Sequence, residues 1–364
     1  MTRIVIFLPS LSGGGAERVL LQVANEISSR GYEVDLVLSS VTGPYISEVI
    51  NSINIVDLGA SRVLFSLFPL WLYIKRSTPK IILSALSHAN LVAIISVMFS
   101  KFKPRVVISE RNIITQESIN NQGMKGSILR YLMHKFYHRA DSAITVSNGV
   151  SDSLIQYTKL LNKDIFVVPN PCDIDRISLL SNKPIDDNWF FSSKLPVVIG
   201  IGRLTRQKDF HLLIKAFSIV LKENNARLLI LGEGELRSEL ESLALSLGLN
   251  EKNFFMPGFV SNPFNYLKNS NVFVLSSRWE GFPNVLLHAL GCGCPIVATD
   301  CRSGPVEILE NGKWGYLTPV GDVEAMAKSI TLSLEGKNKH DLESRCLFFD
   351  IETTVNKYIK VIFR

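Results

Sequence analysis

The residues best suited to chemistry in this sequence are two cations, Arg203 and Lys208, and one carboxylate, Glu280. Both cations lie in the segment Gly202–Lys208, directly after an apolar run that predicts a buried parallel strand. Two cations beside a helix start suit a diphosphate group whose negative charge must be stabilised as it leaves. An exposed basic loop would contain the same residues, but their position at a strand end favours the functional interpretation.

Glu280 belongs to a strand–loop–helix pattern that occurs twice between residues 272 and 309. The apolar runs at 272–277 and 295–300 predict buried parallel strands, and each precedes a helix start, at Pro283 and at Pro305. Helix N-termini present free N–H groups and the positive end of the helix dipole, so we expect an anionic ligand at this sheet edge. A carboxylate in front of the first helix is costly unless polar groups meet it.

Two further predicted strands end in glycine-containing turns, Gly232-Glu233-Gly234 and Gly258-Phe259-Val260. Turns of this kind let the backbone approach a base or a ribose, although each one alone is weak support for a site. Four successive strand ends marked by glycine or charge are the pattern of a binding site.

The first half of the sequence opens with a predicted strand at 4–8, a glycine turn at 12–15, a helix at 16–30 and a strand at 34–38. This is a Rossmann-like unit, but it lacks the G-x-G-x-x-G motif and its ribose-binding acid. The glycine turn at 12–15 suits phosphate binding and a simple tight turn equally well.

The length of 364 residues predicts two domains, and 46% apolar with 20% charged residues is typical of a folded globular protein. No signal peptide and no apolar run long enough to span a bilayer is recognisable. The five cysteines form no C-x-x-C pair, and no histidine completes a metal site with Cys292, Cys294 and Cys301. We therefore expect buried cytosolic thiols and no metal.

The net charge of +6 is local, because residues 62–139 contain 12 basic and 2 acidic residues. An anionic membrane surface, a phosphate-bearing substrate and nucleic acid are the candidate partners. No nucleic-acid-binding module is present, which disfavours the third. Residues 62–76 are apolar and aromatic with basic ends, and they suit a core helix and an interfacial helix equally.

Residues 126–140 predict an amphipathic helix, with Ile128, Leu129, Leu132 and Met133 on the inner side. Its outer face contains no acid, whereas a merely solvated face would mix both signs, so we favour contact with phosphate or a membrane. The basic residues of this face are Arg130, His134, Lys135, His138 and Arg139.

Turn signals and composition predict a first domain at 1–171, a polar linker at 172–195 and a second domain at 196–349. The fold class is α/β, with two doubly wound domains and a cleft between them. We expect further strands at 80–86, 106–109, 143–146, 165–168, 196–201, 227–231 and 254–257, and helices at 91–99, 210–222, 235–248, 262–270, 323–334 and 350–363.

The segments IGRLTRQKDFHLLIKAF, LLILGEGELRSELE, MPGF, SRWEGFPNVLLHALGCGCPIVATD and SGPVEIL, with GGGAERVLLQVA and VPNPCD, resemble the retaining glycosyltransferases of family 4. The resemblance covers nearly the whole chain. It implies the GT-B fold, in which two Rossmann-like domains face each other across a donor cleft, and a last helix (350–364) that crosses back to the first domain. It also implies a hexosyltransferase that needs no metal and no cofactor.

By the same resemblance, Arg203 and Lys208 would bind the donor diphosphate, and Glu280 would contact the transferred sugar. The reaction would proceed on the front face through an oxocarbenium-like state, without a side-chain nucleophile. The implied donor-binding residues are Gly14, Gly15, Gly232, Glu233, Gly234, Phe259, Val260, Phe282, Pro283, Asn284, Val285, Leu286 and His288.

The sequence departs from the family pattern at two positions. His288 replaces the second glutamate, eight residues after Glu280, that bonds the ribose; imidazole can hydrogen-bond a hydroxyl but supplies no carboxylate charge. Asp209 stands where the loop usually has glycine. Near the acceptor the family often has a histidine, and either His88 or the segment with Glu110 and Arg111 is the nearest equivalent.

We therefore expect a cytoplasmic, peripheral membrane glycosyltransferase. It would move a sugar from a UDP-sugar, galactose-type or N-acetylhexosamine, in α-linkage onto a saccharide carried by polyprenyl diphosphate during bacterial surface-polysaccharide assembly of the O-antigen or capsule kind. Its partners would be the donor, the lipid-linked acceptor and the inner-membrane surface. The alternatives are a GDP-mannose-dependent enzyme of the same family, a nucleotide-sugar epimerase of the same fold, and an inactive partner subunit, which His288 would favour.

Overall fold

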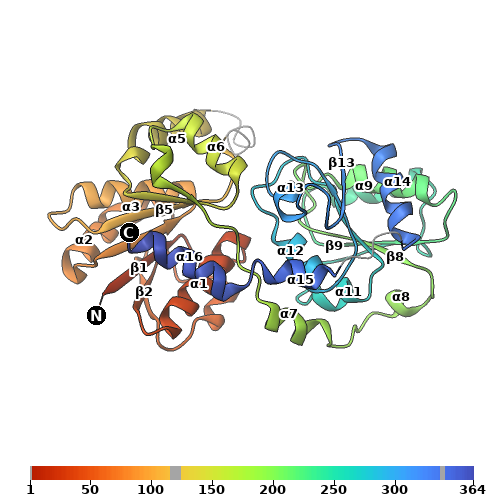
Figure 1. The fold of residues 1–364 in the computed structure, drawn as a ribbon, viewed down its shortest axis with the longest axis horizontal. Helices are drawn as coiled ribbons and strands as arrows, with labels where there is room; N and C mark the ends of the chain where they lie inside the picture. Colours follow the sequence, from red (N-terminus) through yellow and green to blue (C-terminus); the bar gives the residue numbers. More distant parts are fainter. Residues whose placement is uncertain (1, 115–123, 337–340) are drawn as a thin grey trace. The chain divides into compact units, whose positions relative to one another are not determined.

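The structure is a computed structural model, and it describes residues 2–114, 124–336 and 341–364. The chain divides into two compact units, each an α/β layer structure (Figure 1). Unit 1 contains Met1–Pro171 and Ile351–Arg364, and unit 2 contains Cys172–Asp350. The chain therefore leaves unit 1 at residue 171 and returns to it for its last helix.

Unit 1 has, within the described residues, a seven-stranded parallel sheet with the order β3-β2-β1-β4-β5-β6-β7. The strands are β1 (Arg3–Leu8), β2 (Glu33–Leu38), β3 (Asn54–Asp57), β4 (Ile81–Ala85), β5 (Arg105–Glu110), β6 (Ser142–Thr145) and β7 (Ile165–Val167). The central strands are buried on both faces, which is why their sequences are continuous apolar runs rather than alternating ones. The strand order reverses between β1 and β4.

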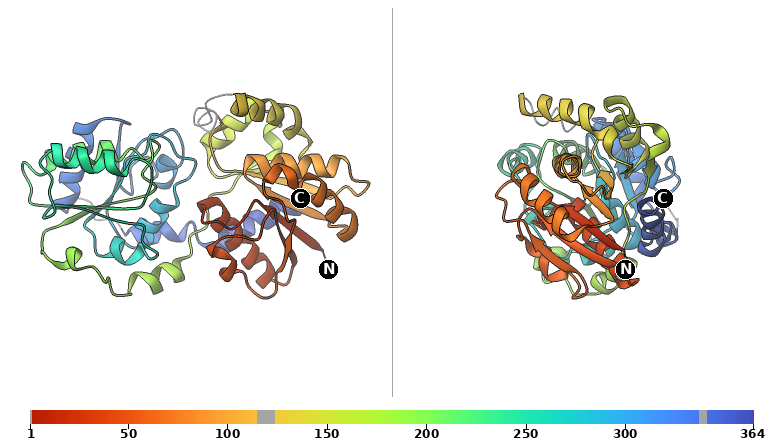
Figure 2. Two further views of the ribbon diagram at one scale, coloured as in Figure 1. Left: turned by 180° about the vertical axis from the view of Figure 1, so that it is seen from behind. Right: turned by 90° about the vertical axis from the view of Figure 1, so that its left-hand side faces the viewer.

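Helices cover both faces of this sheet. On one face α1 (Gly15–Ser29) packs against the last helix, α16 (Ile351–Ile362). On the other face α3 (Ser87–Met98) contacts both α2 (Leu67–Ser77) and α5 (Met124–Phe136), with α6 (Asn148–Tyr157) beyond α5 (Figure 2). Short 3-10 turns complete the unit: η1 (Pro44–Glu48), η2 (Val63–Ser66), η3 (Tyr137–Arg139) and η4 (Asn162–Asp164).

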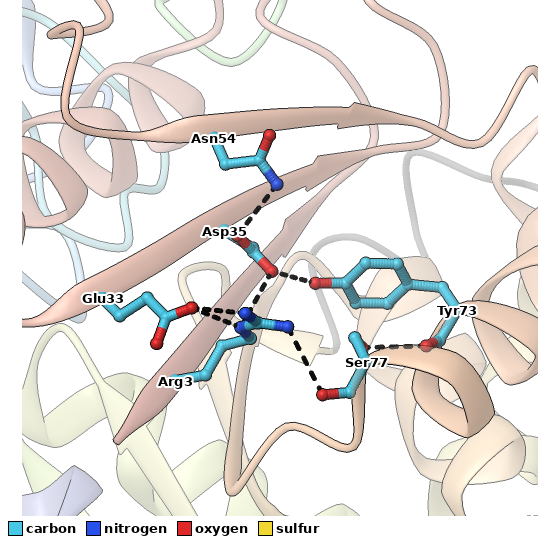
Figure 3. Close-up of polar contacts among 6 residues, drawn as sticks. All are labelled: Arg3, Glu33, Asp35, Asn54, Tyr73 and Ser77. Carbon is cyan, nitrogen blue, oxygen red and sulfur yellow. Dashed lines mark hydrogen bonds and ion pairs between the residues drawn. The ribbon is translucent and has the colours of Figure 1, made fainter. Parts of the chain in front are cut away.

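A polar cluster fastens α2 to the edge of the sheet (Figure 3). Tyr73 of α2 donates a hydrogen bond to Asp35 of β2, and Asp35 also accepts one from Asn54 of β3 at 3.0 Å. Arg3 of β1 pairs with Glu33 and lies 3.6 Å from Asp35. Burial and the bond to Asp35 raise the pKa of Tyr73 well above its usual value. The phenol therefore stays protonated and keeps donating at neutral pH.

Unit 2 has, in its described part, a six-stranded parallel sheet with the order β10-β9-β8-β11-β12-β13. The strands are β8 (Val197–Ile201), β9 (Arg227–Leu231), β10 (Phe254–Gly258), β11 (Val272–Leu275), β12 (Ile296–Thr299) and β13 (Tyr316–Thr318). The order reverses between β8 and β11. In doubly wound sheets such a reversal opens a crevice at the carboxyl ends of the strands, and ligands bind there.

The helices of unit 2 form a layer on each side of the sheet (Figure 1). One layer contains α9 (Phe210–Val220), α10 (Arg237–Ser246) and α14 (Val323–Leu334). The other contains α7 (Ile174–Ser181), α11 (Phe264–Lys268), α12 (Asn284–Gly291) and α15 (Leu342–Leu347), which pack against one another. Two short helices, α8 (Asn188–Phe191) and α13 (Pro305–Ile308), lie in the connections.

The structure differs from the predicted linker at 172–195, because this segment contains α7 and α8. Their side chains Ile177 and Phe190 are buried in unit 2. The caps Asp173 and Asp187 accept hydrogen bonds from the backbone of each helix start. The polar composition that indicated a linker therefore reflects helix caps.

The predicted helix at 62–76 is divided into η2 and α2, and Pro69 lies in the first turn of α2, where a missing N–H costs little. Leu70 and Ile74 are buried, whereas Phe65 and Phe68 are exposed. The segment is thus core on one side and open to solvent on the other. No helix in the described ranges is long and apolar enough to cross a bilayer.

Candidate functional site

The loops after β8 and β11 meet at the point where the strand order of unit 2 reverses. The backbone N–H of Arg278 donates to the Gln207 carbonyl at 2.8 Å, and the Ser276 hydroxyl donates to the Lys208 carbonyl at 2.7 Å. Lys208 Nζ then lies 2.6 Å from Glu280 Oε1. Two residues that are 72 positions apart in sequence are thus held as an ion pair at the ligand-binding edge of the sheet.

The carboxylate of Glu280 is buried and its orientation is set by several donors. The Ser277 hydroxyl donates to Oε1 at 2.7 Å, and Gln207 Nε2 lies 3.5 Å from Oε2 and 3.0 Å from the Trp279 carbonyl. The Glu280 side chain is 7% exposed and that of Lys208 is 18% exposed. Charges this far from water interact strongly, so the pair holds a defined geometry that a ligand can use.

Asp209, the departure from glycine, has a physical explanation in an ion pair. It adopts a left-handed backbone conformation with φ of 45°, which is unfavourable for a residue with a Cβ. Its buried carboxylate lies 2.7 Å from Arg278 Nε. This interaction offsets the backbone cost and joins the start of α9 to the loop that contains Glu280. Arg203, in the same β8 loop, is exposed.

The glycine-containing ends of β9 and β10 lie beside the β8 loop, so the structure brings the four marked strand ends together in the order β10-β9-β8-β11. Gly232 N–H donates to the Gly258 carbonyl at 2.8 Å, and Leu204 N–H donates to the Glu233 carbonyl at 2.9 Å. A Cβ on Gly232 or Gly234 would collide with the carbonyl of residue 202 or 204. These two glycines therefore permit contact between loops, which is a different reason from the predicted approach to a base.

Among the side chains predicted to bind the nucleotide, Phe259 is the most open. It is 78% exposed at the end of β10, and Val260 beside it is half-buried. The exposed carboxylate of Glu233 pairs at 2.8 Å with Arg237, the first residue of α10. An exposed aromatic ring at the binding edge is available for stacking against a base.

The N-terminus of α12 forms the next part of this edge. Pro283 is the cap and supplies no side-chain hydrogen bond, while the Leu286 N–H donates to its carbonyl at 3.0 Å. Phe282 is buried, and Asn284 and Val285 are half-buried. The second predicted helix start leads only to the four-residue α13, so a sustained helix dipole at this edge comes from α12.

His288 lies in α12, one turn after Asn284. Its ring is half-buried and packs edge-on against Phe264 of α11, with 4.9 Å between the ring centroids. A carboxylate at this position would bring a charge against a buried aromatic ring, which is unfavourable.

Gly14 and Gly15 belong to unit 1, where Gly14 caps α1. The N–H groups of Gly13 and Gly14 each donate to Glu17 Oε2 at 3.1 Å. Glu17 thus closes the start of α1 in the manner of a capping box. A phosphate that used these N–H groups would have to displace the Glu17 carboxylate.

Glu110 and Arg111, the acceptor-side candidates, have different environments. Glu110 is buried and accepts hydrogen bonds from the Ser87 hydroxyl at 3.0 Å and the Tyr137 hydroxyl at 2.9 Å. The buried guanidinium of Arg111 donates to Asn170 and, at 2.8 Å, to the Tyr358 hydroxyl of α16. Arg111 therefore ties β5 to the last helix. The alternative residue, His88, is exposed.

The basic side chains of the predicted amphipathic helix are all exposed: Arg130, His134, Lys135, His138 and Arg139. Leu129 and Met133 are buried, as predicted for the inner side of this helix. Ile128 was also predicted there, but it is 51% exposed. At 100° per residue Ile128 lies about 90° from the middle of the buried stripe, toward Tyr131. The outer face of α5 therefore mixes cations with the exposed apolar residues Met124, Ile128 and Tyr131.

Ser277, Gln207 and Arg278 contact the candidate residues but were not singled out from the sequence. Each is next to, or within three positions of, a predicted residue, and its type alone is ordinary for a polar loop. Only the register that brings the β8 and β11 loops together reveals their roles. In a doubly wound sheet these two loops are expected to be adjacent, and this expectation could have identified the three residues from the sequence.

Family models cover both units of the chain. The model for glycosyl transferases group 1 matches residues 182–345, and the model for Glycosyltransferase Family 4 matches residues 13–176. The chain belongs to the family 4 glycosyltransferases, and it is an enzyme that transfers a hexosyl group. Its two Rossmann-like units are those of the GT-B fold.

Among relatives, the chain is 29% identical over 366 residues to a Campylobacter jejuni enzyme, covering 96% of each chain. That enzyme is named as an N-acetylgalactosaminyltransferase acting on a diphospho-undecaprenol-linked saccharide. A second C. jejuni α-1,4-N-acetyl-D-galactosaminyltransferase, also acting on an undecaprenol-linked saccharide, is 27% identical and covers 100% of this chain and 98% of its own. Among solved structures, Anabaena HepE in complex with UDP and glucose superimposes with a TM-score of 0.79, at 20% identity and 99% coverage of both chains.

Proposed function

We propose that this glycosyltransferase retains the anomeric configuration and transfers a sugar from a UDP-sugar, in α-linkage, to a saccharide carried on polyprenyl diphosphate. It would act as a peripheral protein at the cytoplasmic face of the membrane, in the assembly of a bacterial surface polysaccharide or related glycan. The observation that carries the proposal is the Lys208–Glu280 pair, 2.6 Å apart at the strand-order reversal of unit 2.

The charges around this pair suit a nucleotide diphosphate. Lys208 and the exposed Arg203 supply two cations, and the α12 N-terminus adds its dipole on the other side of the reversal. As the bond between the sugar C1 and the diphosphate oxygen breaks, negative charge grows on the leaving group. Fixed cations lower the energy of that state without reorganising. Metal ions and other cofactors are not required by this scheme.

Glu280 would act on the sugar. A carboxylate held by Ser277 and Lys208 can accept hydrogen bonds from sugar hydroxyls and orient C1 toward the acceptor. The acceptor hydroxyl then attacks from the face that the diphosphate leaves, and its proton passes to the departing phosphate oxygen. Retention follows from attack on that face, and no covalent intermediate with the protein is needed.

The relatives favour a galactose-type or N-acetylhexosamine donor, because both C. jejuni enzymes are named for N-acetylgalactosamine transfer to undecaprenol-linked saccharides. The uridine nucleotide is supported by the UDP complex of HepE, which shares the fold. For the acceptor, the exposed basic residues Arg130, His134 and Lys135 on α5, with His138 on η3, suit the diphosphate of a lipid carrier. GDP-mannose remains the alternative donor.

A panel of nucleotide sugars tests the proposal. The purified protein is incubated with UDP-N-acetylgalactosamine, UDP-N-acetylglucosamine, UDP-galactose, UDP-glucose or GDP-mannose, and with a short-chain polyprenyl diphosphate saccharide. We expect acceptor-dependent release of UDP, and an α-linked product by NMR. Release with GDP-mannose alone would select the alternative donor, and a β-linked product would refute retention.

A further inference from the structure

Unit 1 exposes an apolar surface that its fold does not explain. The large side chains Leu64, Phe65, Phe68, Phe99 and Phe102, here called the aromatic patch, are between 47% and 72% exposed. They come from η2, α2 and the α3–β5 connection, and α3 contacts both η2 and α2. Folded domains seldom expose several large apolar residues together unless the surface binds a partner.

Contacts within unit 1 hold the patch together. Trp71 Nε1 of α2 donates to the Phe99 carbonyl at 3.1 Å, and the Phe68 and Trp71 rings are 5.5 Å apart. The bond from Tyr73 to Asp35 fastens the same helix to the sheet (Figure 3). The exposed rings are therefore mounted on a helix that is anchored on its inner side.

The sequence that forms the patch is rich in cations and contains no acid. No aspartate or glutamate occurs between Asp57 and Glu110, and Glu110 is buried. The exposed cations of this stretch are Arg62, Lys75, Arg76, Lys80, Lys101 and Lys103. Exposed aromatic rings on a segment with exposed cations and no acid fit the boundary between an anionic headgroup layer and the acyl chains.

A cavity of about 360 Å³ opens beside the patch, between the end of α3 and the starts of β5 and β6. Three cations line it: Lys103, Arg105 and Arg139. Lys103 Nζ donates to the Val97 and Met98 carbonyls at 3.1 and 3.0 Å, which places the ammonium at the negative end of α3. The cavity volume lies within the range of about 300–1,000 Å³ for small-molecule sites.

The balance of charge in this cavity favours an anion. Its acidic residue, Asp141, accepts a hydrogen bond from the Val106 N–H at 2.7 Å. Arg105 donates to the Ser142 hydroxyl at 2.6 Å and to the Val361 carbonyl of α16 at 3.4 Å. The three cations that line the cavity therefore bring more positive charge to it than Asp141 offsets, which suits a phosphate group.

We propose that the aromatic patch and this cavity form a docking site for an anionic phospholipid membrane, in which the cavity receives a headgroup phosphate and the rings enter the interface. The inference rests on the proposed function, because a lipid-linked acceptor is available only at a membrane surface. It adds the surface that docks and the lipid chemistry that is recognised. Neither belongs to the donor site in unit 2.

The course of α5 links this docking site to the ligand-binding edge of unit 1. The chain passes from α5 through η3 to the start of β6, so Arg139 lies at the cavity and the helix runs back toward the carboxyl ends of the strands. Thirteen residues at about 1.5 Å per residue span roughly 20 Å. The exposed cations of α5 lie along this path.

Sedimentation with vesicles tests the proposal. Wild-type protein is mixed with vesicles of phosphatidylcholine alone, or of phosphatidylcholine containing phosphatidylglycerol. Two variants are compared: Lys103→Gln with Arg139→Gln in the cavity, and Phe99→Ser with Phe102→Ser in the patch. The matched control, Lys222→Gln with Lys328→Gln, removes the same charge from exposed positions in unit 2.

We expect wild type and control to bind the anionic vesicles, and each test variant to bind about tenfold more weakly. Thermal unfolding confirms that all variants are folded. Equal binding by the cavity variant and the control would refute the cavity as a headgroup site. Equal binding by the patch variant would refute insertion of the rings.

A phosphate arm identifies the source of the anion. Inorganic phosphate is titrated against wild type and the cavity variant and followed by thermal shift. If phosphate stabilises only wild type while no protein sediments with anionic vesicles, the cavity binds a soluble phosphate and membrane docking is wrong. Sugar transfer to a water-soluble acceptor analogue is measured in parallel. Loss of transfer in all proteins would refute the proposed function while leaving vesicle binding to be judged separately.

Discussion

At the scale of single residues, Glu280 is the group on which the proposed chemistry depends. Its Oε1 receives hydrogen bonds from both Ser277 and Lys208, whereas Oε2 has, among the residues that the structure describes, the long contact to Gln207. This asymmetry orients the carboxylate and leaves acceptor capacity on the second oxygen. A sugar hydroxyl can use that capacity without breaking the ion pair.

We predict that Glu280→Gln lowers sugar transfer by about 100-fold or more, because the amide keeps the shape but loses the charge and one acceptor oxygen. Nucleotide release with donor and acceptor measures the effect, and thermal unfolding checks the fold. The control is Glu239→Gln, which changes an exposed glutamate paired with His211 at 2.8 Å. Turnover equal to that of the control would remove Glu280 from the mechanism.

His288 tests how the donor ribose is held. If a carboxylate at this position would grip the ribose hydroxyls, His288→Glu should lower the KM for the donor by about fivefold, since hydrogen bonds to a charged group are stronger by about 1 kcal/mol. The Glu variant would also lose the edge-on contact with Phe264, so a lower melting temperature is expected. The uncharged control is His288→Gln, and an unchanged KM in the Glu variant would show that this position does not contact the ribose.

The five cysteines behave as core residues, and all are free and buried. Burial raises the pKa of both Cys292 and Cys301 to about 12. We predict that native protein at pH 8 does not react with a thiol-specific disulfide reagent, because only about one thiol in ten thousand at such a pKa is ionised. Reaction should appear on unfolding, and rapid labelling of the native protein would contradict the burial.

The same pKa shifts give the sign of a pH effect on stability. Folding favours the protonated thiols, since their folded pKa exceeds the unfolded value of about 8.5. Their contribution is therefore complete below about pH 8.5 and declines as the pH rises toward 12.

At the scale of elements, the donor site depends on how the loops after β8, β9 and β10 fit against one another. Gly232 has φ of 145°, and a Cβ there would collide with the Gly202 carbonyl. The loop that contains Arg203 and Lys208 is supported on that side by these backbone contacts. Disturbing them would displace the cations by a distance that matters for diphosphate binding.

We predict that Gly232→Ala destabilises the protein by about 2 kcal/mol or more and weakens donor binding. Gly248→Ala is the matched control, because it also has positive φ, at 82°, but a Cβ there meets nothing within 4 Å. Chemical unfolding measures the stability, and titration with UDP measures binding. Equal losses in the two variants would show that backbone strain, rather than the loop contact, causes the effect.

Most of the regular elements could be predicted because their patterns were strong. The apolar runs of β1, β4, β8, β9 and β12 allow few alternatives to a buried parallel strand. By contrast β3 lies at the sheet edge with Asn54, Ile55 and Asp57 exposed, so it lacks an apolar signature. The short helices α7, α8 and α15 are held by packing and by aspartate caps, and periodicity over a few residues cannot show that.

The site divides in the same way. Lys208, Arg203 and Glu280 could be proposed from residue type and strand-end position, and the structure places Lys208 and Glu280 in contact. The partners Ser277 and Asp209 depend on the pairing of β8 with β11, which joins residues about 70 positions apart. Whether Gly14 and Gly15 reach the donor stays a prediction, because Glu17 bonds the adjacent backbone in this structure.

At the scale of the whole molecule, the chain passes between the units twice, and its two crossing points are neighbours. The Cys172 N–H donates to the Phe349 carbonyl at 2.7 Å, and Cys172 forms a bridge with Asp350. After this point α16 returns to unit 1, where Tyr358 and Val355 are fully buried. The Arg111 guanidinium donates a hydrogen bond to Tyr358 of this helix. Arg111 therefore has a structural role, although it lies next to the buried Glu110 and was a candidate for ligand binding.

The two units also divide the proposed tasks. Unit 2 contains the donor-binding edge, and unit 1 contains the exposed cations of α5, the aromatic patch and its cavity. These features of unit 1 are formed mostly by residues within 62–139, the stretch of the sequence that contains the excess of basic residues. Donor binding by unit 2 is the task that the family implies. Membrane docking by unit 1 is inferred from the side chains of this chain.

Calorimetric titration with UDP tests the central claim most directly, because it measures nucleotide binding without requiring the correct sugar or acceptor. The variant Arg203→Gln with Lys208→Gln removes both cations, while the amide introduced at position 208 can still donate a hydrogen bond to Glu280. The control Lys215→Gln with Lys222→Gln removes two exposed charges elsewhere in unit 2. We predict that wild type and control bind UDP alike and that the cation variant binds at least tenfold more weakly. Equal affinity in all three proteins would contradict a donor site at the reversal between β8 and β11.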